Sequence, residues 1–222
     1  MDTVPTDSQL ESQFFSSSES LFSTERDSDD YKFMSSVTLV TDGEFRVLVD
    51  TGLATDINGE TFILKRLNEI GALPSSITHV ITTHGHLDHS GNNNDFANAI
   101  HYIGRFKHSG MYSNFSRIFK DEVEILTRNI HLLKSPGHTS EDISVFVRNT
   151  SFFGNVIISG DVFIRKEDLK YPNIWKSLAI NEMQQEESRR RLACIADHII
   201  PGHGPIFRVT NRMKRKFKCI IN

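Results

Sequence analysis

The chain has 222 residues, of which 38% are hydrophobic and 24% charged, with a formal net charge of −3. This composition suits a globular core and excludes a protein embedded in a membrane or disordered throughout. No apolar run approaches the ~18–20 residues of a membrane helix, so we expect no membrane partner. No basic patch followed by an apolar stretch opens the sequence, so we expect no secretory signal, and two cysteines, Cys194 and Cys219, are too few for a disulfide framework. We therefore expect a reducing compartment: the cytoplasm, with the nucleus as a second location.

Residues 1–30 form an acidic segment rich in serine. It holds eight of the 28 acidic residues and one of the 25 basic residues. Such a segment cannot bury enough apolar surface to offset the entropy of ordering, so a mostly disordered tail is predicted. The alternative is an anchor strand or docking peptide that uses Phe14, Phe15 and Phe22. Residues 31–222 are expected to form one folded domain.

The first half of this domain begins with a predicted hairpin. Over 35–52, β-branched residues flank an Asp-Gly pair, which is a favoured two-residue turn. Apolar residues then recur at helical spacing over 61–73, with Gly71 and Pro74 as stop signals. The elements expected next are a buried strand over 78–83, a helix over 94–99, a strand over 101–104 and a poorly patterned loop over 105–120.

The second half is predicted to be a series of short strands followed by a helix. Runs rich in apolar residues predict strands over 123–126, 130–133, 143–147 and 155–159. A helix is expected over 178–197, and a last strand and loop over 198–205. The apolar candidates of that helix are Ile180, Met183, Leu192, Ile195 and Ala196. Strands separated by occasional helices predict an α/β layered domain.

The strongest chemical signal is the pattern His84-x-His86-x-Asp88-His89. Residues two apart on an extended segment point the same way, so His84 and His86 can bind one ion. If a helix starts at Asp88, then Asp88 and His89 face a different point nearby. The pattern thus offers two adjacent ligand sets, and its imidazole and carboxylate groups suit zinc, iron or manganese, with zinc favoured. The alternative is a surface histidine cluster that binds no ion.

Three further ligand-type residues follow apolar strands: His138, Asp161 and His203. Each lies beside a glycine, where the backbone can come close to a bound group. Taken singly, each is more often a solvated loop residue than a ligand. Together with the first pattern they form a set.

Five segments, VLVDTG, THGHLDH, SPGHT, SGDVF and PGHGP, resemble the metallo-β-lactamase superfamily in order over residues 34–207. The resemblance implies an α/β fold, the four-layer αβ/βα sandwich, with a metal site along one edge of two packed sheets. It assigns one metal to His84, His86 and His138, and the other to Asp88, His89 and His203. It also implies that Asp161 bridges both metals and that Asp50 orients their ligands.

A water held between two such cations ionises near neutral pH and becomes a hydroxide that attacks a carbonyl or phosphoryl centre. Asp88 or Asp161 is then the catalytic carboxylate that orients the nucleophile. These steps predict a metal-dependent hydrolase with two zinc ions, while iron and manganese remain open.

The lengths of two segments limit which branches of the superfamily the chain can resemble. A glyoxalase II carries a glutathione-binding domain after its last metal histidine, whereas 19 residues follow His203. The large RNA-cleaving relatives insert a domain between Asp161 and His203, which are 42 positions apart here. The motif flanks resemble a small animal branch described as metal-dependent endoribonucleases that act on histone pre-mRNA 3′ ends. RNA is therefore the predicted substrate. A glyoxalase II-like hydrolase of small-molecule esters or thioesters and a mononuclear-iron persulfide dioxygenase are the alternatives.

An RNA substrate calls for cations and aromatic rings around the site. The residues proposed for RNA contacts are Arg212, Lys214, Arg215 and Lys216, which a final helix would otherwise expose to solvent. A second basic group comprises Arg189, Arg190 and Arg191. The rings that could stack on bases, or else pack under their loop, are Phe106, Tyr112 and Phe115. A homodimer is left open.

Overall fold

The computed structural model describes residues 12–15 and 34–220. Strand β1 (Ser12–Phe15) pairs antiparallel with β2 (Val37–Asp42) and forms one edge of a sheet. The rest of the segment expected to be a tail over 1–30 lies outside the described residues.

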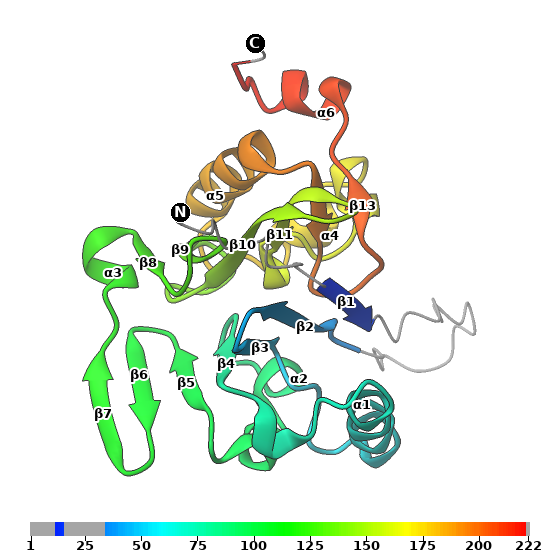
Figure 1. Ribbon diagram of the computed structural model, residues 1–222. Helices are drawn as coiled ribbons and strands as arrows, with labels where there is room; N and C mark the ends of the chain where they lie inside the picture. The colour runs from blue at the N-terminus through cyan, green and yellow to red at the C-terminus, as the bar shows by residue number, and fades with distance from the viewer. Residues whose placement is uncertain (1–11, 16–33, 221–222) are drawn as a thin grey trace, which may run out of the picture.

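The first sheet has seven strands in the order β1 to β7 (Figure 1). Strands β3, β4 and β5 run parallel to one another, and the other neighbours are antiparallel. The remaining strands are β3 (Phe45–Val49), β4 (His79–Thr82), β5 (Ile100–Ile103), β6 (Phe106–Ser109) and β7 (Tyr112–Phe115). The predicted hairpin is confirmed as β2 and β3.

The second sheet has six strands in the order β13-β12-β11-β10-β9-β8. Strands β11 and β12 are parallel, so both end at the same edge of the sheet. The strands are β8 (Val123–Ile125), β9 (Ile130–Lys134), β10 (Ile143–Thr150), β11 (Gly154–Ile158), β12 (His198–Ile200) and β13 (Phe207–Arg208).

Helices α1 (Ile57–Glu69) and α5 (Glu182–Ile195) cover the outer faces of the two sheets. The other helices of the described residues are α2 (Leu87–Ser90), α3 (Ile118–Asp121), α4 (Asn173–Lys176) and α6 (Asn211–Lys216). Short 3₁₀ turns occur at Pro74–Ser76, Asn93–Phe96, Gly160–Val162 and Lys166–Leu169. Among the described residues, none of these helices has the length and apolar character of a membrane span.

Side chains that alternate across each strand build three apolar layers. In β3, Val47 and Val49 join the core between the sheets, whereas Leu48 packs with Leu67 of α1. In β11, Ile157 likewise packs with residues of α5, including Leu192. Figure 1 shows α1 outside the lower sheet and α5 outside the upper sheet. The predicted α/β fold, a four-layer αβ/βα sandwich, is confirmed.

Two predicted elements have different bounds in the structure. Helix α1 begins at Ile57, before the predicted start at residue 61, because the Asp56 side chain accepts a hydrogen bond of 3.0 Å from Gly59 N and caps the helix. The prediction of a loop over 105–120 is wrong, because β6, β7 and α3 lie there. All four residues of β7 are exposed, so the strand lacks the apolar alternation that would have predicted it.

Helix α5 is shorter than the predicted helix over 178–197, and its buried face is largely polar. Leu192 is 2% exposed as expected, but Ile180 and Met183 are 74% and 81% exposed. The side chains of Gln185 and Arg189 are buried on the helix instead. Apolar spacing therefore located the helix and the buried Leu192 and Ala196, but it missed the polar part of the buried face.

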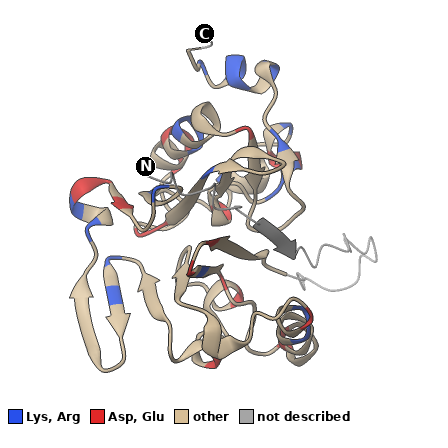
Figure 2. Cartoon of the chain, viewed as in Figure 1, with Lys and Arg blue, Asp and Glu red and all other residues tan. Residues whose placement is uncertain are grey.

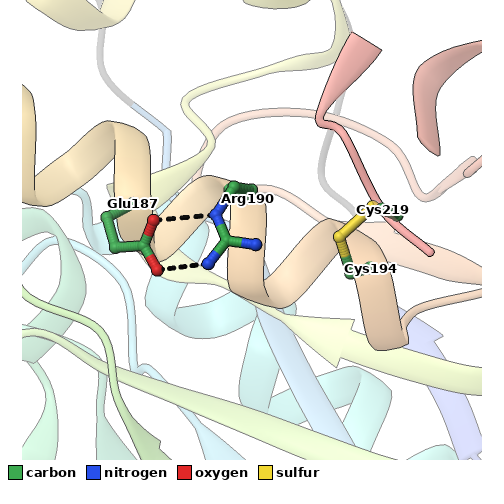
Figure 3. Close-up of a disulfide and its surroundings, with 4 residues drawn as sticks. All are labelled: Glu187, Arg190, Cys194 and Cys219. Carbon is green, nitrogen blue, oxygen red and sulfur yellow. Dashed lines mark hydrogen bonds and ion pairs between the residues drawn. A yellow bond between two sulfur atoms is a disulfide. The ribbon is translucent and has the colours of Figure 1, made fainter. Parts of the chain in front are cut away.

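A disulfide joins Cys194 of α5 to Cys219 beyond α6 (Figure 3). This bond removes the cysteine-based argument for a reducing compartment. The two residues are 25 positions apart in sequence, and only the fold of α6 back toward α5 brings them together.

Candidate metal centre

Four of the predicted ligands meet where strands from both sheets end. His84 follows β4, His138 follows β9 and Asp161 follows β11. Their ligand atoms and that of His86 all lie within 4.8 Å of one another. His86 Nδ1 is 2.9 Å from His84 Nε2 and 3.1 Å from His138 Nε2. We call the three histidines, His84, His86 and His138, the first ligand set.

The second ligand set comprises Asp88, His89 and His203, whose ligand atoms also lie within 4.8 Å of one another. Asp88 and His89 belong to α2, so the start of the helix turns both away from the preceding extended segment. Asp88 Oδ2 lies 3.4 Å from His89 Nε2 and 3.5 Å from His203 Nε2. The loop after β12 therefore completes a site that α2 begins.

The carboxylate of Asp161 lies between the two sets. Its Oδ1 is 3.2 Å from both His89 Nε2 and His203 Nε2. Its Oδ2 is 3.5 Å from His138 Nε2 and 3.9 Å from His84 Nε2. His203 Nε2 also lies 3.3 Å from Oδ2. One carboxylate thus presents an oxygen to each set, as a bridging ligand requires.

Glycine at position 202 allows the last loop to approach Asp161. A Cβ atom at Gly202 would lie 1.8 Å from Asp161 Oδ1, closer than any side chain permits. The PGHGP segment therefore needs this glycine for close packing, and His203 reaches the centre because of it.

Asp50, predicted to orient the ligands, is 1% exposed at the end of β3. Its Oδ1 accepts a hydrogen bond of 2.7 Å from Thr83 N, and its Oδ2 accepts one of 2.9 Å from Thr83 Oγ1. The same Oδ2 lies 2.8 Å from His89 Nδ1, which leaves Nε2 facing Asp161. Carboxylates commonly hold ligating imidazoles in this way. Thr83 was not identified from the sequence, because a threonine at a strand end carries no distinguishing signal.

Burial and the neighbouring charges shift the pKa values of the ligands in opposite directions. Burial and the nearby His89 lower the pKa of His84 to about 2, and burial lowers the pKa of His138. Burial opposes ionisation of Asp161, but His89 and His203 hold its pKa well below the usual value. The carboxylates of Asp161 and Asp50 outweigh burial and raise the pKa of His89 well above its ordinary range. Metal binds neutral imidazoles and ionised carboxylates, so an ion entering the centre would displace the proton of His89.

The donor atoms fit a pair of metal ions. Around a tetrahedral zinc with ligands at ~2.1 Å, ligand atoms lie roughly 3.4 Å apart, and the donor distances above run from 2.9 to 3.9 Å. His89 Nε2 and Asp161 Oδ1 are buried and lie 3.2 Å apart, but among the described residues neither atom makes a contact with the geometry of a hydrogen bond. A buried carboxylate surrounded by imidazoles is costly unless a cation compensates it. His86 is exposed, so the centre is open to solvent on one side.

The loop that carries His138 is held by a second buried carboxylate, which the sequence did not single out. Asp142 is 2% exposed and accepts hydrogen bonds of 2.7 Å from Thr139 N and 2.6 Å from Thr139 Oγ1. Burial raises the pKa of Asp142 to about 7. In the sequence, Asp142 is only an acidic residue at the end of the segment 140–142 after a turn, and nothing in that segment indicates burial.

The basic residues proposed for RNA contacts lie away from the metal ligands. Figure 2 shows the cations of α6 at the outer end of the molecule, beyond α5, whereas α2 lies in the opposite layer. Those residues are Arg212, Lys214, Arg215 and Lys216. In the second basic group, Arg189 is 2% exposed and pairs with Asp168 at 2.6 Å. Arg190 pairs with Glu187 on the surface (Figure 3). Burial thus removes Arg189 from the candidate RNA surface.

Comparison with known proteins gives a family match over part of the chain. The model of the metallo-beta-lactamase superfamily matches residues 30–105. Metallo-beta-lactamase domain-containing protein 1 of Xenopus laevis is 38% identical over 178 residues, which is 78% of this chain and 72% of that protein. An uncharacterised protein of Caenorhabditis elegans is 37% identical over 185 residues, and the alignment spans 83% of this chain but 51% of that protein.

The fold also matches solved structures at low sequence identity. The crystal structure of a quorum-quenching N-acyl homoserine lactone lactonase aligns with a TM-score of 0.57 and 22% identity. The alignment covers 76% of this chain and 79% of that one. The match supports the arrangement of the two sheets and their covering helices.

Proposed function

The chain belongs to the metallo-β-lactamase superfamily, and from this premise we propose that it is a hydrolase with two zinc ions at the centre described above. The observation that carries the proposal is the position of Asp161, with one oxygen toward each ligand set. His84, His86 and His138 would hold one ion, while Asp88, His89 and His203 would hold the other. When bound, two such ions make water nucleophilic near neutral pH and stabilise negative charge that develops on the substrate.

The protein's own groups hold the reactants in place. The Asp88 side chain is 17% exposed, so it can accept a proton from water entering on the solvent side. Asp161 is buried and ionised, which fixes negative charge between the two ligand sets. Asp50 keeps His89 Nε2 turned toward Asp161 through the contact at Nδ1. The arrangement suits attack on an electrophilic carbonyl or phosphoryl centre.

For the substrate we propose RNA, cleaved endonucleolytically at the 3′ end of histone pre-mRNA. The support is the set of motif flanks around His84, His138, Asp161 and His203 that resembles the branch with this activity. Because α6 lies beyond α5, its cations would contact RNA away from the cleaved bond. They would strengthen RNA binding in a manner that depends on salt concentration, and they would not raise the rate of cleavage at the scissile phosphate.

Exposed apolar side chains beside the ligands favour a second candidate, the hydrolysis of small-molecule esters or thioesters. Leu87, between His86 and Asp88, is 72% exposed. Ile180 is 74% exposed, and its backbone N–H donates a hydrogen bond of 3.2 Å to His138 O. Exposed apolar residues that adjoin the ligand-bearing segments would suit an uncharged acyl group better than a polyanion.

The test offers RNA and a panel of esters and thioesters to equal amounts of zinc-loaded protein. The first proposal predicts RNA cleavage that is lost, together with bound zinc, in His86→Ala. The matched control is His108→Ala, since His108 lies on β6 and bonds Ser113 instead. Ester turnover without RNA cleavage would replace the first candidate with the second. A loaded protein that hydrolyses neither class, or a His86→Ala variant that keeps full activity, would refute the proposal.

A further inference from the structure

Helix α5 supplies no predicted metal ligand, yet it contacts the loop that carries Asp161. Gln185 is fully buried, and its Nε2 donates hydrogen bonds of 2.9 Å to Asp161 O and 3.2 Å to Val162 O. Arg189 Nη1 donates another hydrogen bond of 2.7 Å to Val162 O. The backbone at the bridging carboxylate is therefore held by two side chains of one helix face.

The same helix face holds the loop that carries His138. Ser188 Oγ donates a hydrogen bond of 2.8 Å to Pro136 O. A Cβ atom at Gly137, whose φ is +145°, would lie 2.2 Å from the backbone of Gln185, so the loop lies directly against the helix. At the start of α5, Asn181 N donates a hydrogen bond of 2.9 Å to Gly137 O. One helix thus spans the two ligand loops.

Arg189 is itself fixed, so the helix face is rigid. It makes a two-point ion pair with Asp168, at 2.6 and 3.0 Å, and both side chains are buried. Its guanidinium lies 4.1 Å from the ring centroid of Phe163 and 4.9 Å from that of Trp175. Asp168 also accepts a hydrogen bond of 2.9 Å from Ile164 N, so the segment after Asp161 is held from both sides.

We propose that the buried polar face of α5, formed by Gln185, Ser188 and Arg189, sets the separation of His138 and Asp161 and thereby the affinity of the first ligand set for its metal. These three are positioning residues, since they act on backbone carbonyls of the ligand loops and not on the metal or the substrate. Groups that orient ligands in this way commonly change metal affinity by about 10- to 100-fold when they are removed. The inference rests on the proposed metal centre.

The test measures zinc affinity of the metal-free full chain by competition with a chelator. Gln185→Met keeps the length and volume of the side chain but removes its donor, so zinc affinity should fall by about 10- to 100-fold. The control is Leu192→Ala, on the same helix but in the apolar layer. It should lower the melting temperature while zinc affinity stays within about threefold of the wild type.

Each outcome decides the inference. Unchanged zinc affinity in Gln185→Met overturns it, as does an equal loss of affinity in Leu192→Ala. If Gln185→Met does not fold, Ser188→Ala decides, because it removes only the hydroxyl that bonds Pro136 O; weaker zinc binding supports the inference and unchanged binding overturns it. A wild-type chain that binds no zinc would instead contradict the proposed function.

Discussion

The candidate metal centre lies where strands of both sheets end, whereas the β6–β7 hairpin forms one edge of the first sheet. The two regions differ in how their side chains are held. At the centre, His89 is fully buried, and Asp50 and Asp161 face its two ring nitrogens. In the hairpin, Tyr112 and Phe115 are about three-quarters exposed, and Phe115 stacks on Phe106 at 5.3 Å. A buried polar group that several neighbours contact cannot move without losing those contacts, whereas an exposed ring can. Substitutions at the candidate centre should therefore reduce hydrolysis and zinc binding by orders of magnitude more than substitutions in the hairpin.

The largest effect is expected at Asp161. Asp161→Asn keeps the shape of the side chain but removes the charge between the two ligand sets. Hydrolysis should fall by more than about 100-fold, and zinc should be lost from both sets. Steady-state kinetics and metal analysis of the purified variant measure these effects. The matched control is Asp121→Asn on the exposed end of α3, which should retain wild-type activity; equal activity of the two variants would contradict the bridging role.

A second prediction concerns the loop that carries His138. In the metal-free folded chain Asp142 keeps its proton up to about pH 7, whereas the unfolded chain releases it near the ordinary value of 3.8. The free energy of unfolding should therefore fall as the pH rises from about 4 to 7 and then level off. Asp142→Asn lacks this dependence, so its stability relative to wild type should improve by up to ~4 kcal/mol across that range.

Denaturant unfolding of both proteins in the presence of a chelator, at several pH values, measures the difference. If the two proteins keep a constant stability difference between pH 4 and 7, the raised pKa of Asp142 is wrong. A difference that changes only below pH 4 would indicate an ordinary, solvated carboxyl.

The disulfide should have an intermediate effect, confined to stability. It closes a loop of 25 residues between α5 and the segment after α6. Cys219→Ser should lower the free energy of unfolding by about 3 kcal/mol, while metal content stays unchanged because neither cysteine belongs to the groups of described residues that could hold a metal. Thermal melting of the variant beside the oxidised and reduced wild type gives the comparison. A variant as stable as the oxidised wild type would show that the bond contributes nothing.

The smallest effect is expected in the hairpin. Phe115→Ser removes an exposed ring, so the free energy of unfolding should change by no more than about 0.5 kcal/mol, as for other surface substitutions. Zinc content and kcat should stay at wild-type values. If RNA stacks on this ring, KM for RNA should rise while turnover of small esters is unaffected. A large loss of zinc in this variant would break the contrast between the two regions.

The sequence predicted the parts of the fold that depend on apolar spacing. The β2–β3 hairpin, the buried strands and helix α1 all carry period-two or helical patterns, and the glycines near His203 and Asp161 marked the loops where backbone packs closely. The family resemblance assigned roles to the residues that the fold then brought within hydrogen-bond reach, including Asp50.

Other features depend on tertiary contacts that no local pattern records. Strand β7 is wholly exposed, so its pairing with β6 alone defines it. Gln185 and Arg189 look like solvated helix residues in the sequence and are buried only because the Asp161 loop packs on α5. The partner of Cys194 likewise depends on where α6 folds.

Metal analysis of the purified full-length chain tests the central claim most directly. After incubation with zinc and removal of the excess, the wild type should retain about two zinc ions per chain, as two ligand sets that share a bridging carboxylate require. Retention of no zinc by correctly folded protein, or of the same two ions by Asp161→Asn, would contradict the account.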